Sequence, residues 1–151
     1  KATNIIPTYP LQASAVELPD VHWAMQLPDT REPVRNGASA AFLNSFGRGD
    51  RDQNRRRSDG SVLQALNMMN NAYVMGKVHQ NNAGSRVAAI LNETSEPVAI
   101  IQQLFLNTLS RPATDAEVGM FQRLFQQQSV RVAAESLQWI LLNKLEFLFN
   151  Y

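Results

Sequence analysis

The pattern of apolar and polar positions is most regular in the last third of the chain, over residues 95–151. Apolar side chains recur there every three or four residues in three segments, which predicts three helices that each bury one face. A polar run at residues 126–129 separates the second segment from the third. The apolar positions of the three segments are, in order, Val98, Ile101, Leu104, Phe105, Thr108 and Leu109; Val118, Phe121, Leu124 and Phe125; and Val130, Ala133, Ala134, Leu137, Ile140, Leu141 and Leu145.

Local start and stop signals delimit these helices. Ser95 offers an N-cap hydroxyl, and Pro97 stands near the first helical position, where a missing N–H is harmless. Pro112 ends the first helix, because the residue before a proline avoids the helical conformation. Thr114 and Glu117 have the spacing of a capping box, in which each side chain accepts a hydrogen bond from the other residue's N–H. We therefore expect the second helix to begin at Thr114.

Shorter helical patterns precede this region, at residues 38–46, 58–70, 72–79 and 85–91, with a break or kink at Asn70–Asn71. Together the patterns predict an all-α fold, a compact bundle of about six helices. Four methionines fall on the apolar faces and are interpreted as core residues rather than as a binding surface. They are Met68, Met69, Met75 and Met120.

Residues 1–35 contain five of the seven prolines, a spacing that leaves no room for a stable helix. We expect an extended, proline-rich arm here, packed on a helical domain at residues 36–151. Short edge strands and an irregular packed arm are both compatible with its apolar pattern. Because the chain begins at Lys1 without methionine, in the middle of a proline-spaced segment, it is interpreted as the C-terminal fragment of a longer protein.

The amino-acid composition excludes only a few classes of site and ligand. A formal net charge of +1 gives no overall preference for nucleic acid or an anionic membrane. The absence of cysteine excludes disulfides, thiolate zinc sites and iron–sulfur clusters within these 151 residues. No apolar run approaches the roughly 20 residues that a membrane helix requires. We therefore expect neither membrane insertion nor nucleic-acid binding.

One segment concentrates charge, residues 48–57, with five arginines against two aspartates. Guanidinium groups suit bidentate recognition of carboxylate, phosphate or sulfate. The alternative is a solvated loop in which the arginines pair with Asp50, Asp52 and Asp59 or cap helix carbonyls. No aromatic residue interleaves with the arginines, which disfavours single-stranded nucleic acid as a ligand. The candidate anion-binding residues are Arg48, Arg51, Arg55, Arg56 and Arg57.

The sequence offers no catalytic constellation. His22 and His79 are far apart, and neither has a carboxylate or a second histidine at metal-ligand spacing. No G-x-S-x-G or S-x-x-K motif and no glycine-rich phosphate loop is present. We name no catalytic, cofactor-binding or metal-binding residue, and this favours a protein that is not an enzyme.

Four ordered motifs carry a family resemblance: FLNSFGRGDR at residues 42–51, RSDGSVLQALNMMN at 57–70, LFLNTLSRPAT at 104–114 and WILLNKLEFLFN at 139–150. Over about residues 36–151 the chain resembles the domain of unknown function 1553. That resemblance implies a C-terminal domain of a large exported protein of planctomycete-type bacteria. It also implies other domains in the parent chain, often including a cytochrome-c-like haem domain, so that haem would lie outside this segment.

Arg111 and Glu146 are lone charges beside apolar runs. We predict that they form a buried or half-buried ion pair that joins the second and third C-terminal helices. Two hypotheses for function remain open. The first is a non-catalytic helical module that packs on other domains of its parent or binds a partner, with an acidic polysaccharide as the candidate ligand. The second is a domain that completes the active site of a haem-linked or polysaccharide-degrading enzyme, where its arginines orient an anionic substrate.

Overall fold

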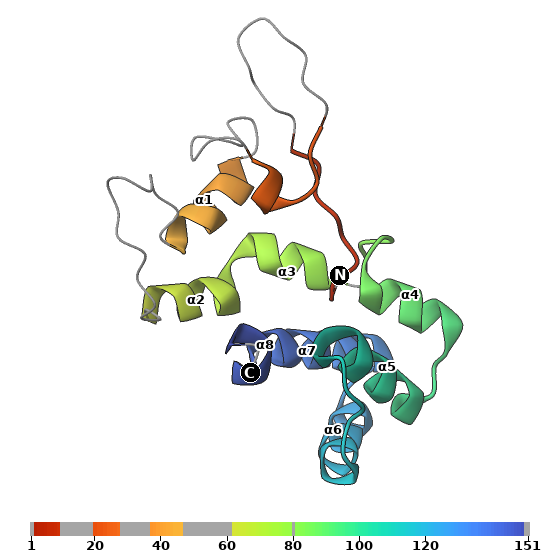
Figure 1. The fold of residues 1–151 in the computed structure, drawn as a ribbon. Helices are drawn as coiled ribbons and strands as arrows, with labels where there is room; N and C mark the ends of the chain where they lie inside the picture. Colours follow the sequence, from red (N-terminus) through yellow and green to blue (C-terminus); the bar gives the residue numbers. More distant parts are fainter. Residues whose placement is uncertain (1, 10–19, 28–36, 47–61, 80, 150–151) are drawn as a thin grey trace, which may run out of the picture. The chain divides into compact units, whose positions relative to one another are not determined.

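The structure, a computed structural model, describes residues 2–9, 20–27, 37–46, 62–79 and 81–149 (Figure 1). The predicted all-α class is confirmed, since the described residues form eight α-helices, one short 3-10 helix and no strand. The elements in chain order are η1 (Ala24–Gln26), α1 (Gly37–Ser45), α2 (Val62–Asn70), α3 (Ala72–Val78), α4 (Arg86–Glu93), α5 (Pro97–Leu109), α6 (Asp115–Gln127), α7 (Val130–Asn143) and α8 (Leu145–Phe149).

Contacts divide the chain into two compact units. The first contains the residues up to Ile5 and those from Val74 onward, and the second contains Ile6–Tyr73. The arm expected at residues 1–35 stays a prediction, because residues 10–19 and 28–36 lie outside the part of the chain that is described.

In the second unit, an isolated antiparallel bridge joins two distant segments. Tyr9 N–H donates to Val21 O at 2.8 Å, and Val21 N–H donates to Tyr9 O at 3.2 Å. The Tyr9 ring is buried, and its hydroxyl lies 3.3 Å from that of Tyr73. The Tyr73 ring in turn contacts the ring of Phe42 of α1 in a tilted arrangement, with ring centroids 5.1 Å apart and an interplanar angle of 33°. Aromatic contacts therefore connect the N-terminal segment, α1 and the start of α3.

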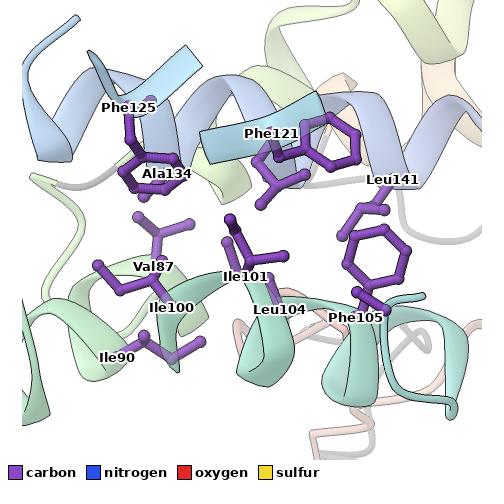
Figure 2. Packing of buried hydrophobic residues seen from close by; sticks show 13 residues of the cluster. Val87, Ile90, Ile100, Ile101, Leu104, Phe105, Phe121, Phe125, Ala134 and Leu141 are labelled. Carbon is purple, nitrogen blue, oxygen red and sulfur yellow. The ribbon is translucent and has the colours of Figure 1, made fainter. Parts of the chain in front are cut away.

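The core of the first unit is centred on α5, which contacts α4, α6, α7 and α8. Ile101, Leu104 and Phe105 of α5 are fully buried, as are Ala133 and Ala134 of α7. The two alanines have small side chains, which allows the α5 and α7 backbones to approach closely. Figure 2 shows aliphatic and aromatic side chains from α4, α5, α6 and α7 converging on one interior.

Capping explains where the C-terminal helices begin. The N-cap of α5 is Glu96, and the prediction of Ser95 was wrong by one residue. The Glu96 carboxylate accepts hydrogen bonds from two N–H groups of the first turn, which a Ser95 hydroxyl one residue earlier does not provide. The predicted capping box of α6 is confirmed, because Thr114 Oγ1 accepts from Glu117 N–H at 3.3 Å and Glu117 Oε2 accepts from Thr114 N–H at 2.9 Å.

The third predicted C-terminal helix is interrupted, so the seven helical segments of the sequence pattern correspond to eight α-helices among the described residues. Lys144 has an extended backbone (φ −66°, ψ 141°), so α7 ends at Asn143 and α8 begins at Leu145. Leu145, predicted to face the core, is 68% exposed as a result. The break changes the direction of the helical face for every residue that follows it.

Three of the methionines interpreted as core residues are also exposed, namely Met69, Met75 and Met120. On α6 the reason is geometric. Phe121 and Phe125 occupy the face toward α5, and Met120 is rotated about 100° away from Phe121 on the helix. No helix among the described residues is long and apolar enough to cross a membrane.

Candidate functional site

The predicted anion-binding segment cannot be placed. Arg48, Arg51, Arg55, Arg56 and Arg57 all fall within residues 47–61, outside the described residues. Their role in binding an anion therefore stays a prediction.

Arg111, in the loop between α5 and α6, is the centre of a network of charged side chains. Its Nε donates to Glu146 Oε1 at 2.6 Å and its Nη2 to Glu146 Oε2 at 2.9 Å. Its Nη1 and Nη2 donate to Glu117 Oε2 and Oε1, both at 2.9 Å. The second Nη1 hydrogen donates to Pro112 O at 3.0 Å. All five donors of the guanidinium group are thus engaged.

Glu117 is the second centre of this network. Besides the two bonds from Arg111, its carboxylate accepts from the N–H and hydroxyl of Thr114 and from Lys144 Nζ at 2.8 Å. Lys144 is the residue at the break between α7 and α8. We call Arg111, Glu117, Lys144 and Glu146 the charge cluster. It contains two cations and two carboxylates, and it joins the α5–α6 loop to α6, α7 and α8.

Phe105 of α5 lies beneath the charge cluster. The Arg111 guanidinium carbon is 5.3 Å from the centroid of the ring, and Lys144 Nζ is 5.4 Å from it. Both distances are within the range of cation–π attraction. Because Phe105 is fully buried, the ring presents an apolar surface to one side of the ion pairs. The charge cluster is therefore held both by its internal ion pairs and by its contact with the core residue Phe105.

The electrostatics follow from these contacts. Hydrogen bonds to Glu117, and then to Glu146, raise the pKa of Arg111 above its ordinary value. The hydrogen bonds from Arg111 hold the pKa of Glu117 well below its ordinary value, with Lys144 and Thr114 acting in the same direction. Arg111 also lowers the pKa of the Glu146 carboxyl, which is more exposed. The contacts thus favour the charged forms of Arg111, Glu117 and Glu146.

The ion pair expected between Arg111 and Glu146 is present and half-buried, with side chains 33% and 40% exposed. The elements that it joins differ from the expectation. Arg111 lies in a loop and Glu146 on the separate helix α8, because the chain breaks at Lys144. Sequence reasoning missed Glu117 and Lys144 as partners, and the capping-box spacing of Glu117 was the one available signal.

His22 and His79 lie in different units. His22 Nδ1 is 3.3 Å from Pro7 O, and His79 Nδ1 is 3.4 Å from Glu135 Oε1. Among the residues that the structure describes, no group of three or more histidine, aspartate and glutamate side chains is placed to hold a metal ion.

A half-open cavity of about 400 Å³ lies among α3, α6 and α7 of the first unit. Glu135 and Trp139 of α7 line it, together with Leu124 of α6 and His79 at the end of α3. Sequence reasoning did not single out this site. Glu135 and Trp139 are four residues apart and therefore lie on one helical face, a spacing that could have indicated it.

The described residues define the class of the protein as an all-α domain. The family model described as PSD1, a protein of unknown function (DUF1553), matches residues 20–125. This match covers more than half of the 151 residues, and the chain belongs to this family. The match begins before the region of resemblance identified above and ends before its last motif, at residues 139–150. No curated protein and no solved structure matches the chain.

Proposed function

We propose that the chain is a non-catalytic helical module at the C-terminal end of a large exported bacterial protein. Its role is to pack on other domains of that protein or to bind a partner. The observation that carries this proposal is the closed hydrogen bonding of Arg111, whose five donors are all directed at groups of its own chain.

An arginine that orients an anionic substrate needs donors that face the substrate. In the charge cluster, the donors of Arg111 face Glu117, Glu146 and Pro112 O instead. The equal numbers of positive and negative groups also leave the cluster without net charge to attract an anion. These features support a stabilising role for the cluster, which fixes a loop and a terminal helix to the core.

The binding part of the proposal rests on the arginine segment at residues 48–57. Its five arginines exceed its aspartates by three charges, and guanidinium groups bind carboxylates and sulfates in bidentate fashion. An acidic polysaccharide is the ligand class that this chemistry fits in an exported protein. Haem, where the parent protein contains it, would belong to a separate domain.

Binding of the purified chain to a panel of carboxylated and sulfated polysaccharides tests this function. We expect wild-type binding that weakens with added salt, because screening acts on exposed charges. A variant with Arg55, Arg56 and Arg57 all changed to Ala should lose this binding. The double variant Arg123→Ala/Arg131→Ala, which removes two exposed arginines from α6 and α7, should keep it. If both variants lost polysaccharide binding equally, the effect would come from net charge alone. That result would contradict a binding site in the arginine segment.

A further inference from the structure

The sides of α6 and α7 that line the cavity can be identified from residue spacing. Leu124 and Gln128 are four residues apart at the end of α6, and Ser136 and Ile140 have the same spacing on α7. Residues with this spacing share one side of a helix. The cavity of about 400 Å³ therefore lies between facing sides of helices, and its volume is in the usual range of pockets that hold small organic molecules.

Most of the lining is apolar. Leu124 and Ile140 are half-buried aliphatic residues, and Val78 of α3 is 2% exposed. The half-buried indole of Trp139 adds an aromatic surface. A ligand that removes such surface from water is stabilised by the hydrophobic effect, and a second aromatic ring gains edge or offset contacts with the indole. The lining therefore favours a ligand with an aromatic body.

Two neutral polar side chains also line the cavity, those of Ser136 and Gln128. Neither the hydroxyl nor the amide is hydrogen-bonded to another of the described residues. Each can both donate and accept a hydrogen bond, which suits a ligand with one hydroxyl group. A sugar ring fits less well, because most of its hydroxyl groups would meet aliphatic side chains and find no partner there.

The ionisable residues of the lining, Glu135 and His79, are already in contact with each other. Glu135 Oε1 lies 3.4 Å from His79 Nδ1. The Glu135 carboxylate therefore interacts with groups of its own chain. A ligand that recognised this carboxylate by charge would have to compete with these contacts, whereas a neutral ligand leaves them in place.

We propose that this cavity binds a small neutral aromatic alcohol. Its ring packs on Trp139, Leu124 and Ile140. Its hydroxyl group exchanges hydrogen bonds with Ser136 and Gln128, so that neither side chain is left unpaired when water is displaced. The site includes no residue of the arginine segment. The inference therefore goes beyond the proposed function and can fail without it.

Three probes with the same benzyl body test the inference on the full chain: benzyl alcohol, ethylbenzene and benzylammonium. They end in a hydroxyl, a methyl and an ammonium group of similar size. Binding is measured by NMR titration, which includes the shift of the Trp139 indole N–H. We expect benzyl alcohol to bind with a dissociation constant of about 1 mM or below. Benzylammonium should bind about ten-fold more weakly, because its charge loses water against an apolar wall.

Two substitutions of Ser136 separate the hydrogen bond from the space. Ser136→Ala keeps the cavity open and removes the hydroxyl, so it should weaken binding of benzyl alcohol about five-fold and leave ethylbenzene unchanged. Ser136→Phe should abolish binding of both probes, because its ring occupies the cavity. Ser95→Ala and Ser95→Phe, at an exposed position outside the lining, are the matched controls and should leave all affinities unchanged. Circular dichroism shows whether each variant is folded.

Tighter binding of benzylammonium or of the disaccharide cellobiose than of benzyl alcohol would overturn the inference, and would assign the cavity to cations or to sugars. Equal weakening of benzyl alcohol and ethylbenzene by Ser136→Ala would also overturn it, as would wild-type binding by a folded Ser136→Phe variant. Absence of benzyl alcohol binding at about 10 mM would overturn it as well. None of these results bears on polysaccharide binding by the arginine segment, which its own triple variant tests.

Discussion

Arg111 and Glu146 are joined side by side by two hydrogen bonds of 2.6 and 2.9 Å, although 35 residues separate them in the chain. The bidentate geometry fixes both the distance and the relative orientation of the two planar groups. Glu146 is on the five-residue helix α8, too short to be stable alone. We infer that the charge cluster holds this helix in place.

Replacing Arg111 should therefore destabilise the chain. We expect Arg111→Ala to lower the free energy of unfolding by about 2–3 kcal/mol, since several hydrogen bonds to charged groups are lost at a half-buried site. Arg111→Lys should lose less of the free energy of unfolding than Arg111→Ala but should stay below wild type, because an ammonium group cannot form two bidentate pairs. Urea unfolding followed by circular dichroism measures both. Arg123→Ala on the exposed side of α6 is the control, with an expected change within about 0.5 kcal/mol.

Acid should release the same interactions. The pKa of Glu117 is held below its ordinary value of about 4.5, so between the two values the unfolded chain binds more protons than the folded chain. The stabilisation is therefore complete above about pH 4.5 and is lost as the pH falls below it. Glu146 contributes in the same direction.

Unfolding free energies measured from about pH 7 down to about pH 2.5 test this dependence. Glu117→Gln should be less stable than wild type at neutral pH and should lose less stability in acid. Glu93→Gln should keep the wild-type slope. A Glu117→Gln curve parallel to that of wild type would show that the acid sensitivity arises at other carboxylates.

Thr108 and Gln138 form a polar contact within the apolar core between α5 and α7. Gln138 Nε2 donates to Thr108 Oγ1 at 3.1 Å, and the two residues are 1% and 8% exposed. Gln138 Oε1 is buried without a hydrogen-bond partner among the described residues. Thr108→Val should lower the free energy of unfolding by about 1–3 kcal/mol, because it removes the partner of Gln138 Nε2 and so leaves both polar atoms of this buried amide unpaired.

The double variant Thr108→Val/Gln138→Met should be more stable than Thr108→Val alone, because no polar group is then left buried and unpaired. Thermal unfolding of the two single variants and the double variant gives the coupling between the residues. Additive losses would contradict the assignment of the cost to the unpaired amide.

Leu141 and Leu145 test the break between α7 and α8. Leu141 is fully buried and Leu145 is 68% exposed. We expect Leu141→Ala to cost about 2–5 kcal/mol and Leu145→Ala less than about 0.5 kcal/mol. Chemical denaturation of both variants gives the comparison. Similar losses would indicate that α7 continues through Lys144 and buries Leu145.

The local sequence determined the all-α class and many of the helix boundaries. Thr114 and Glu117 satisfy each other's N–H groups across three residues, so the start of α6 depends on nothing distant. The apolar spacing of α5 likewise identified Leu104 and Phe105, which are fully buried. Such features are readable because their causes lie within one helical turn.

Only the tertiary structure determined that the helix ends at Lys144 and which groups surround Arg111. Helical periodicity continues past Lys144 in the sequence, yet its backbone leaves the helix, while its ammonium group binds Glu117 and lies over the Phe105 ring. Glu135 and His79 become neighbours for the same kind of reason, the packing of helices far apart in sequence. These contacts depend on the relative position of whole helices, which follows from burying all their apolar faces at once, and no local pattern specifies it.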